Sequence, residues 1–152
     1  MLSNKAKYAV KALLYLARRH GKDPVLIGDL AVEERIPKKF LESILLELKN
    51  HGLLQSKKGK GGGYQLSKNP DLIALGEVIR IADGPIAPLS CVSQSSYQRC
   101  EECPDEATCG LRIVMKDVRD ATARIVDGVS LKDMLERVDA AVRGGKGTMY
   151  YI

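Results

Sequence analysis

The four cysteines of this 152-residue chain all lie between positions 91 and 109. Their spacing is C-x8-C-x2-C-x5-C, and we take all four as candidate metal ligands: Cys91, Cys100, Cys103 and Cys109. Thiolates hold zinc in all-sulfur sites, and they also hold iron–sulfur clusters. Spacing alone leaves both open, although zinc sites commonly use two short C-x2-4-C pairs and this stretch contains one.

Two further interpretations of the cysteine stretch stay open. The CEEC segment that begins at Cys100 could be a redox pair, although it lacks the βαβ context of a thioredoxin-like site. The thiols could also be incidental. Acidic residues crowd the stretch and disfavour a simple reactive thiolate, an argument that a bound cation would reverse. The pattern therefore favours a metal or cluster loop over a catalytic thiol.

Apolar residues recur at helical spacing three times in the first fifty residues, which predicts three helices. Ser3 or Asn4 can cap the first helix, and Gly21 ends it. The second helix is expected near residues 29–35 and the third over 37–50, joined by a short turn that contains proline. The short turn between these two helices predicts a helix-turn-helix pair, with the third helix as the recognition helix.

Two short strands follow the third helix, at about 53–57 and 64–67, and the glycine-rich segment KGKGGG lies between them. This segment does not have the spacing of a phosphate-binding loop, and a strand rather than a helix follows it. The hairpin completes a winged helix-turn-helix over residues 1–70. The fold class is therefore mainly α, with a small β-hairpin wing.

Charge is divided unevenly along the chain. Residues 1–70 hold 14 Lys and Arg against 6 Asp and Glu, whereas residues 71–152 hold 10 against 13. A basic first half favours contact with a polyanion through that half. The candidate DNA-binding residues are those at the start of the recognition helix and in the wing: Lys38, Lys39, Phe40, Glu42, Ser43, Lys57, Lys58, Lys60, Gly61, Gly62 and Tyr64. Glu42 could accept a hydrogen bond from a cytosine amino group or make a local interaction.

The second half of the chain, residues 71–138, is expected to contain a linker helix, the cysteine loop (85–110), a long helix (111–127) and a short final helix that Ser130 caps. Residues 139–152 are expected to form a flexible tail. The long helix carries an apolar stripe that has to be buried, and a two-fold dimer is the simplest solution. The candidate dimer residues are Leu111, Val114, Val118, Ala121 and Ile125.

Several function classes receive no support from the sequence. The N-terminus lacks the pattern of a signal peptide, and no apolar run approaches the roughly 20 residues of a membrane span. We therefore expect a cytoplasmic protein with no membrane partner. In a reducing cytosol, clustered cysteines are more often metal ligands or redox thiols than structural disulfides. No catalytic residues are expected, so the chain is not predicted to be an enzyme.

Four segments together resemble the Rrf-type winged-helix transcription regulators, the group that includes IscR, NsrR, RirA and CymR. They are KYAVKALLYLA, PKKFLESILLELKNHGLL, KKGKGGGYQLSKNP and IALGEVIRIADGPIAP, and the resemblance covers roughly residues 1–138. It implies a homodimer that binds palindromic double-stranded DNA and represses or activates nearby genes. The cluster-binding members hold a [2Fe–2S] or [4Fe–4S] cluster with three cysteines, which Cys91, Cys103 and Cys109 match.

The fourth ligand is where this chain departs from the group. The resemblance implies a histidine at position 112 or an aspartate at position 7, but the sequence has Arg112 and Lys7. Cys100 is extra to the three-cysteine pattern, so we expect it to be the candidate for the fourth ligand. The CymR-like members share the first eighty-odd residues but use no cluster.

The sequence therefore predicts a dimeric DNA-binding regulator whose affinity depends on an iron–sulfur cluster. Two alternatives keep the DNA binding: structural zinc on the loop, or cluster-free thiol sensing. The alternative from another class is an iron–sulfur or dithiol oxidoreductase.

Overall fold

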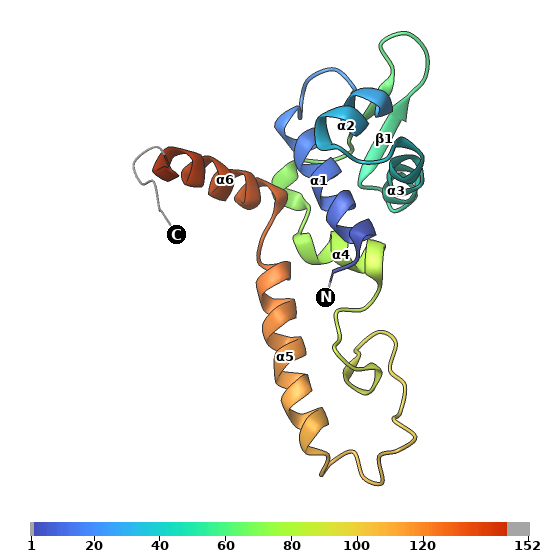
Figure 1. Ribbon diagram of the computed structural model, residues 1–152, viewed down its shortest axis with the longest axis vertical. Helices are drawn as coiled ribbons and strands as arrows, with labels where there is room; N and C mark the ends of the chain where they lie inside the picture. The colour runs from blue at the N-terminus through green and yellow to red at the C-terminus, as the bar shows by residue number, and fades with distance from the viewer. Residues whose placement is uncertain (1, 146–152) are drawn as a thin grey trace.

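The structure, a computed structural model, describes residues 2–145 and is mainly α-helical with one two-stranded antiparallel sheet (Figure 1). This confirms the predicted fold class. The elements in chain order are α1 (Asn4–Arg18), α2 (Ile27–Glu34), α3 (Lys38–Asn50), β1 (Leu54–Lys57), β2 (Gly63–Leu66), the 3-10 turn η1 (Pro70–Leu72), α4 (Leu75–Asp83), the 3-10 turn η2 (Ser90–Val92), α5 (Gly110–Asp127) and α6 (Leu131–Gly145).

We call residues 2–83 together with α6 the winged-helix body. Helix α1 lies at its centre and packs against α2, α3, α4 and α6. Its alanines at positions 6, 9 and 12 are buried and let neighbouring helices approach closely, while Leu13 and Leu16 fill the core. The apolar face of α3 meets them through Leu41, Ile44, Leu45 and Leu48. Burial of this aliphatic set supplies most of the driving force for the fold of the body.

Ser3 caps α1, as the sequence indicated, because its side-chain oxygen accepts a hydrogen bond from the backbone N–H of Ala6 at 3.0 Å. The same residue reaches α4. Its backbone N–H donates to Asp83 Oδ2 at 2.9 Å, and its hydroxyl donates to the other carboxylate oxygen. The start of α1 is therefore fixed to the end of α4.

The turn between α2 and α3 depends on Arg35, which has φ 54° and ψ 47° and is the one non-glycine residue with positive φ within residues 2–145. This left-handed conformation ends α2. The N–H of Ile36 returns to the carbonyl of Ala31 at 3.0 Å, and Ile36 is buried. Pro37 then precedes the first residue of α3. The predicted turn at residues 35–37 is confirmed.

The wing pairs Leu54 with Leu66 at its base and Lys57 with Gly63 near its tip. A second interaction, which the sequence did not predict, anchors the wing to the body. The backbones of Val25 and Tyr64 exchange hydrogen bonds of 2.9 and 2.8 Å, so the segment before α2 acts as a third short strand. The wing is therefore held against the start of α2.

The chain between α4 and α6 makes an excursion away from the body (Figure 1). The cysteine loop leads outward from the end of α4, and α5 leads back. Its return is fixed by backbone hydrogen bonds from Leu75 N–H to Val129 O (2.8 Å) and from Leu131 N–H to Ile73 O (2.9 Å). Arg80 and Asp127 add a two-point ion pair at 2.5 and 2.9 Å, which holds the pKa of the Asp127 carboxyl below its usual value.

Helix α6 is longer than expected. The sequence predicted a short helix and a tail from residue 139, but the helix continues to Gly145, and residues 146–152 lie outside the described part of the chain. Two alanines favour helix at positions 140 and 141. Both terminal guanidinium nitrogens of Arg18 in α1 donate hydrogen bonds to Asp139 Oδ1 at 3.1 Å. These bonds attach this part of α6 to the body.

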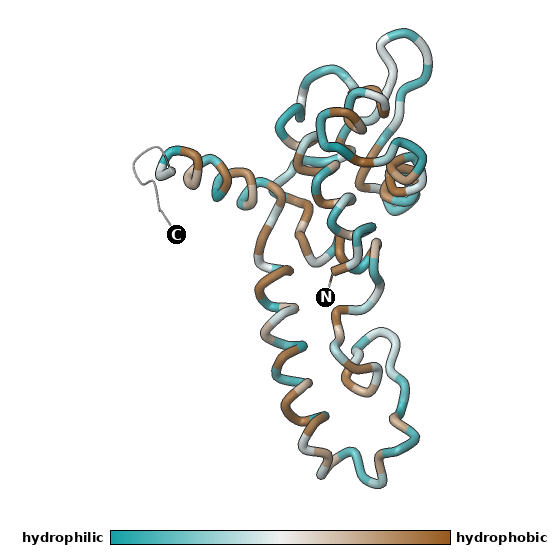
Figure 2. Tube along the Cα trace, viewed as in Figure 1, coloured by the Kyte–Doolittle hydropathy of each residue, from teal (hydrophilic) through white to brown (hydrophobic). Residues whose placement is uncertain are grey.

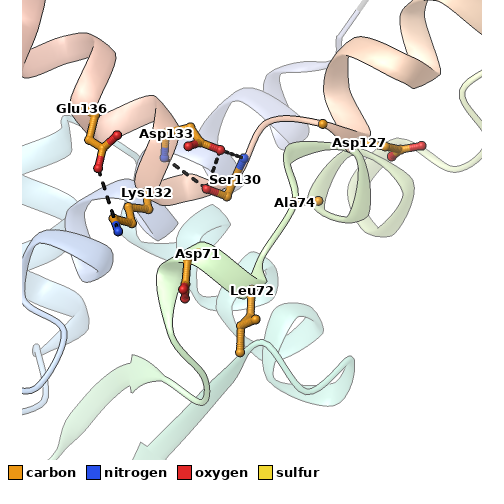
Figure 3. Close-up of a pocket in the computed structure, with 9 residues that line it drawn as sticks. Asp71, Leu72, Ala74, Asp127, Ser130, Lys132, Asp133 and Glu136 are labelled. Carbon is orange, nitrogen blue, oxygen red and sulfur yellow. Dashed lines mark hydrogen bonds and ion pairs between the residues drawn. The ribbon is translucent and has the colours of Figure 1, made fainter.

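The start of α6 is capped reciprocally, as Figure 3 shows. Ser130 Oγ accepts from the N–H of Asp133 at 3.1 Å, and Asp133 Oδ2 accepts from the N–H of Ser130 at 2.8 Å. This second bond lowers the pKa of the Asp133 carboxyl. Leu131, the first residue of α6, is completely buried in the core. The predicted cap at Ser130 is confirmed, and α6 is part of the winged-helix body.

Gly63 provides a test of the wing's attachment. Its φ is +140°, and a Cβ atom there would lie 2.3 Å from the carbonyl oxygen of Val25, a backbone atom that cannot move cheaply. We expect Gly63→Ala to break the Val25–Tyr64 bridge and to lower the free energy of unfolding by about 1–3 kcal/mol. Urea unfolding followed by circular dichroism measures this.

The control is Gly28→Ala in α2, where an added Cβ meets nothing within 4 Å. This variant should be as stable as the wild type or more stable by up to about 1 kcal/mol, because alanine favours helix. An unfolding midpoint for Gly63→Ala equal to that of Gly28→Ala would show that the bridge contributes nothing to stability.

Candidate nucleic-acid interface and cysteine loop

The start of α3, the wing and the first turn of α2 together line one open groove. Lys38 and Glu42 line it from α3, and Lys57 and Tyr64 line it from the wing. All of these except the half-buried Tyr64 are exposed. The structure therefore brings residues from the two predicted DNA-contacting segments together. Within residues 2–145, neither lysine of this groove nor Glu42 forms an ion pair, so their charges face solvent.

Other predicted contact residues surround this groove in different environments. Lys39, Lys58, Lys60 and Gly61 are exposed. Gly62 is buried in the wing tip, where a Cβ atom would lie 2.3 Å from the carbonyl oxygen of Lys57. The absence of a side chain at Gly62 therefore allows the tip to close, and its expected contact with DNA has no exposed surface of its own in this conformation.

Phe40 and Ser43 make local interactions on α3. The Phe40 ring packs edge-on against Tyr8 of α1, with centroids 5.7 Å apart and planes at 83°. The Ser43 hydroxyl donates to the carbonyl of Phe40 at 2.8 Å, so its remaining capacity is as an acceptor. Phe40 is 38% exposed, which leaves part of its ring at the surface. Phe40 therefore packs the start of α3 against α1, whereas the Ser43 hydrogen bond is internal to α3.

The four cysteine side chains are not gathered into one site. Cys91 is buried in η2, Cys100 is exposed, and Cys103 and Cys109 are half-buried. The thiols of Cys103 and Cys109 are within hydrogen-bonding reach of each other, so these two cysteines lie together just before α5. Among the residues that the structure describes, no three or more cysteine, histidine or acidic side chains are placed so as to hold a metal ion.

Cys103 and Cys109 have shifted pKa values of opposite sign. Burial raises the pKa of the Cys103 thiol. Cys109 precedes the first residue of α5, and the pKa of its thiol is lowered, chiefly by the backbone N–H of Arg112 in the first turn. The acidic residues of the loop were expected to disfavour a thiolate, but the N-terminus of the helix outweighs them at Cys109.

The apolar residues of α5 divide between an exposed face and a half-buried face, whereas the sequence analysis treated them as one stripe. The predicted dimer residues all lie on an exposed face: Leu111 (61% exposed), Val114 (55%), Val118 (43%), Ala121 and Ile125 (65%). Met115 and Val126 are half-buried toward the rest of the chain. Figure 2 shows the apolar residues that recur along this helix. Five residues of one 18-residue helix thus present a continuous apolar surface to solvent.

Two arginines of α5 bind backbone carbonyls of η2 in the cysteine loop, a contact that the sequence analysis did not predict. Arg112 Nε donates to the carbonyl of Cys91 at 3.2 Å, and Arg119 donates to the carbonyl of Val92. Arg119 is the one buried residue of α5. A sequence signal existed, because the two arginines are seven residues apart and therefore lie on one helix face.

No enzyme-like site stands out in the described residues. The polar hollow in Figure 3 is lined by Asp71, Leu72, Ala74, Asp127, Gly128, Ser130, Lys132, Asp133 and Glu136. Its polar groups serve the fold: Ser130 and Asp133 cap α6, Lys132 and Glu136 pair at 4.0 Å, and Asp127 binds Arg80. In residues 2–145 no helix is both long and apolar enough to cross a membrane.

Comparison with known families matches residues 2–137 to the Rrf2 family, described as an iron-dependent transcriptional regulator. The chain belongs to the Rrf2 family. This confirms the resemblance found in the sequence. Members of the Rrf2 family to which the chain is related are transcriptional regulators, not enzymes. The chain is therefore a transcriptional regulator of the Rrf2 family, and the oxidoreductase alternative is wrong.

Three relatives place the chain within the Rrf2 family. An rrf2-like HTH-type transcriptional regulator of Rhodobacter capsulatus is 42% identical over 146 residues, which cover 94% of this chain and 97% of the relative. IscR of Aliivibrio salmonicida is 29% identical, covering 95% and 89%. The solved structure of CymR, the global cysteine regulator of Bacillus subtilis, matches with a TM-score of 0.75 and 29% identity, covering 90% and 97%.

Proposed function

We propose that this Rrf2 regulator acts in the cytoplasm as a homodimer on palindromic DNA, and that an iron–sulfur cluster on its cysteine loop controls its affinity for DNA. One observation carries this proposal. The four thiols lie on a loop that starts from α4 of the DNA-binding body and ends at α5, the helix with the unpartnered apolar face. A ligand on this loop therefore acts between the DNA-binding body and the dimer surface.

The groove between α3 and the wing supports the DNA part of the proposal. The lysines at positions 38, 39, 57, 58 and 60 place five positive charges on or beside this groove. In a winged helix the recognition helix enters the major groove, and the wing follows the adjacent backbone. Phosphate contacts of this kind supply most of the affinity and make it depend on salt.

The exposed face of α5 supports the dimer. It runs from Leu111 to Ile125, about 22 Å of helix. An apolar surface of this length is costly to leave in water, and a second copy of the same helix offers a matching surface through a two-fold axis. A dimer also presents two recognition helices to successive major grooves, which a palindromic operator requires.

The donor set fits an iron–sulfur cluster in its chemistry. Soft thiolates are the ligands that such clusters use, and Cys91, Cys103, Cys109 and Cys100 offer four within one loop. Cys103 and Cys109 are already adjacent, and the Arg112 side chain of α5 binds the backbone carbonyl of Cys91. When bound, a cluster would supply a redox-sensitive group whose gain or loss changes how the loop is held. The arginines of α5 cannot act as metal ligands, because a guanidinium stays protonated.

Zinc and cluster-free thiol sensing remain the competing functions of the loop. CymR is a relative, and a solved structure of Staphylococcus aureus CymR is described as an oxidised form. Purification without oxygen, followed by iron and sulfide analysis and a visible spectrum, distinguishes them. A brown protein with iron and sulfide supports the cluster. A colourless protein with stoichiometric zinc, or with no metal, contradicts it.

The first prediction from this proposal concerns DNA affinity. Lys38→Ala should weaken binding to all sequences and reduce the slope of log K against log salt by about 1 for each phosphate that the lysine neutralises. Glu42→Ala should instead change the preferred operator more than the overall affinity, because a carboxylate can accept from a cytosine amino group. Fluorescence anisotropy on a panel of operators at several salt concentrations measures both. An unchanged operator preference in Glu42→Ala would remove its assigned role.

The second prediction concerns the dimer. Val118 is 43% exposed in the single chain, so Val118→Glu should leave the fold intact. A dimer would desolvate this charge at a cost of several kcal/mol, and we expect the variant to be monomeric with no operator binding. Analytical ultracentrifugation measures the mass. Lys116→Glu, an exposed position of α5 outside the predicted dimer residues, is the control and should remain dimeric. A dimeric Val118→Glu would contradict the proposed interface.

The third prediction concerns the fourth ligand. Cys100→Ala should lower cluster occupancy, or its lifetime in air, about as much as Cys91→Ala, because a fourth thiolate completes the sulfur coordination of iron. Iron content and visible absorbance of the four single Cys→Ala variants measure this. Unchanged occupancy in Cys100→Ala, beside losses in the other three, would exclude the all-cysteine site and leave the cluster to three cysteines and another ligand.

A further inference from the structure

The cysteine loop is attached to α5 through main-chain atoms of η2. The carbonyls of Cys91 and Val92 are consecutive acceptors, and Arg112 and Arg119 are the donors. The donors lie two helical turns apart on the same face of α5. The 3-10 turn η2 therefore lies along α5, and these two hydrogen bonds do not involve the side chains at positions 91 and 92.

The Arg119 side chain makes its contact in a buried position rather than at the surface. The residue is 9% exposed, and its guanidinium also donates to Asp120 Oδ1, at 2.8 Å from Nε. A buried guanidinium is tolerated only when its donors are satisfied, and no buried side-chain nitrogen or oxygen in the described residues is without a partner. Cys91, Val92 and Ser93, the residues it helps to hold, are themselves buried.

Arg112, in the first turn of α5, also contacts other parts of the cysteine loop. Its Nε lies 4.0 Å from Glu106 Oε1, and the same carboxylate oxygen accepts a 2.6 Å hydrogen bond from the hydroxyl of Tyr97. Arg112 is thus connected to the start, the middle and the end of the loop. Its backbone N–H also approaches the Cys109 sulfur, so one residue contacts the surroundings of two of the four thiols.

We propose that Arg112 and Arg119 are positioning residues for Cys91. They hold the backbone of the first cysteine at a fixed place on α5, and they make the position of this thiol depend on the position of the helix that carries the dimer surface. Conversely, a movement of the Cys91 backbone is transmitted to α5 through the same hydrogen bonds. This part rests on the proposed function, whereas the attachment of Cys91 does not.

The experiment measures how fast iodoacetamide alkylates each cysteine in the full-length, cluster-free protein, with peptide mass spectrometry to separate the four sites. Loss of a charge-assisted hydrogen bond should release η2, so Arg119→Gln and Arg112→Gln should each speed alkylation of Cys91 about 10-fold. The exposed Cys100 should react at the wild-type rate. Arg119→Lys should give an intermediate rate, because it keeps the positive charge and removes the planar fork of donors.

Arg124→Gln is the matched control and should leave Cys91 protected. Arg124 is an exposed arginine of the same helix, and its side chain forms no hydrogen bond or ion pair within residues 2–145. A Cys91 rate equal to the wild type in both Arg112→Gln and Arg119→Gln would overturn the proposal. If burial of an uncharged side chain prevents Arg119→Gln from folding, Arg112→Gln and Arg119→Lys decide, because the Arg112 side chain is partly exposed and Arg119→Lys keeps the charge.

Cluster loading of the same variants separates this inference from the proposed function. If the wild type binds iron and sulfide, both Arg→Gln variants should lose the visible absorbance in air faster than Arg124→Gln. If the wild type binds neither, the cluster proposal fails while the alkylation rates still decide whether the arginines position Cys91. Equal lifetimes in all variants would show that the attachment does not extend to the cluster.

Discussion

The fixed return of the chain to α4 is the constraint on which the rest of the structure depends. The segment from Gly84 to Ser130 leaves the winged-helix body at the end of α4 and rejoins it beside the start of α4, through two backbone hydrogen bonds and the Arg80–Asp127 ion pair. Because both ends are attached to one helix, α5 cannot change its angle without disturbing α4, and α4 packs directly on α1. The direction of α5 is therefore tied to the body that carries α3 and the wing.

Helix α5 has two chemically different faces, one that is open to solvent and one that binds the cysteine loop. One face is aliphatic and exposed, and a second copy of the chain can cover it. The other carries Arg112 and Arg119, whose guanidinium groups reach the carbonyls of the loop. Burying Arg119 has a desolvation cost that an aliphatic side chain would avoid. The compensation is directional, since an arginine fixes the backbone that it binds, whereas an aliphatic side chain would only pack against it.

The local parts of the fold could be predicted from the sequence, and the non-local parts could not. Periodic leucines marked α1 and α3, Ser3 and Ser130 marked caps, and glycines marked the wing, because each of these signals acts within a few residues. The Val25–Tyr64 bridge and the arginine contacts join segments far apart in the chain and leave no periodic pattern. The extension of α6 past Val138 was missed because its support, the contact of Asp139 with Arg18, is also non-local. For the cysteines, the sequence indicated the donor type but not that Cys103 and Cys109 would be the adjacent pair.

The acceptors in the loop are main-chain carbonyls, and this affects how the loop can diversify. A carbonyl is present whatever the residue, so a substitution at position 91 or 92 keeps both acceptors of the arginines, provided that the new side chain fits the buried space there. In the proposed function, substitutions that alter the thiols change which ligand the loop holds, while the main-chain attachment of the loop to α5 is kept. The ligand of the loop can therefore diverge between related proteins without a change in how the loop is joined to the helix.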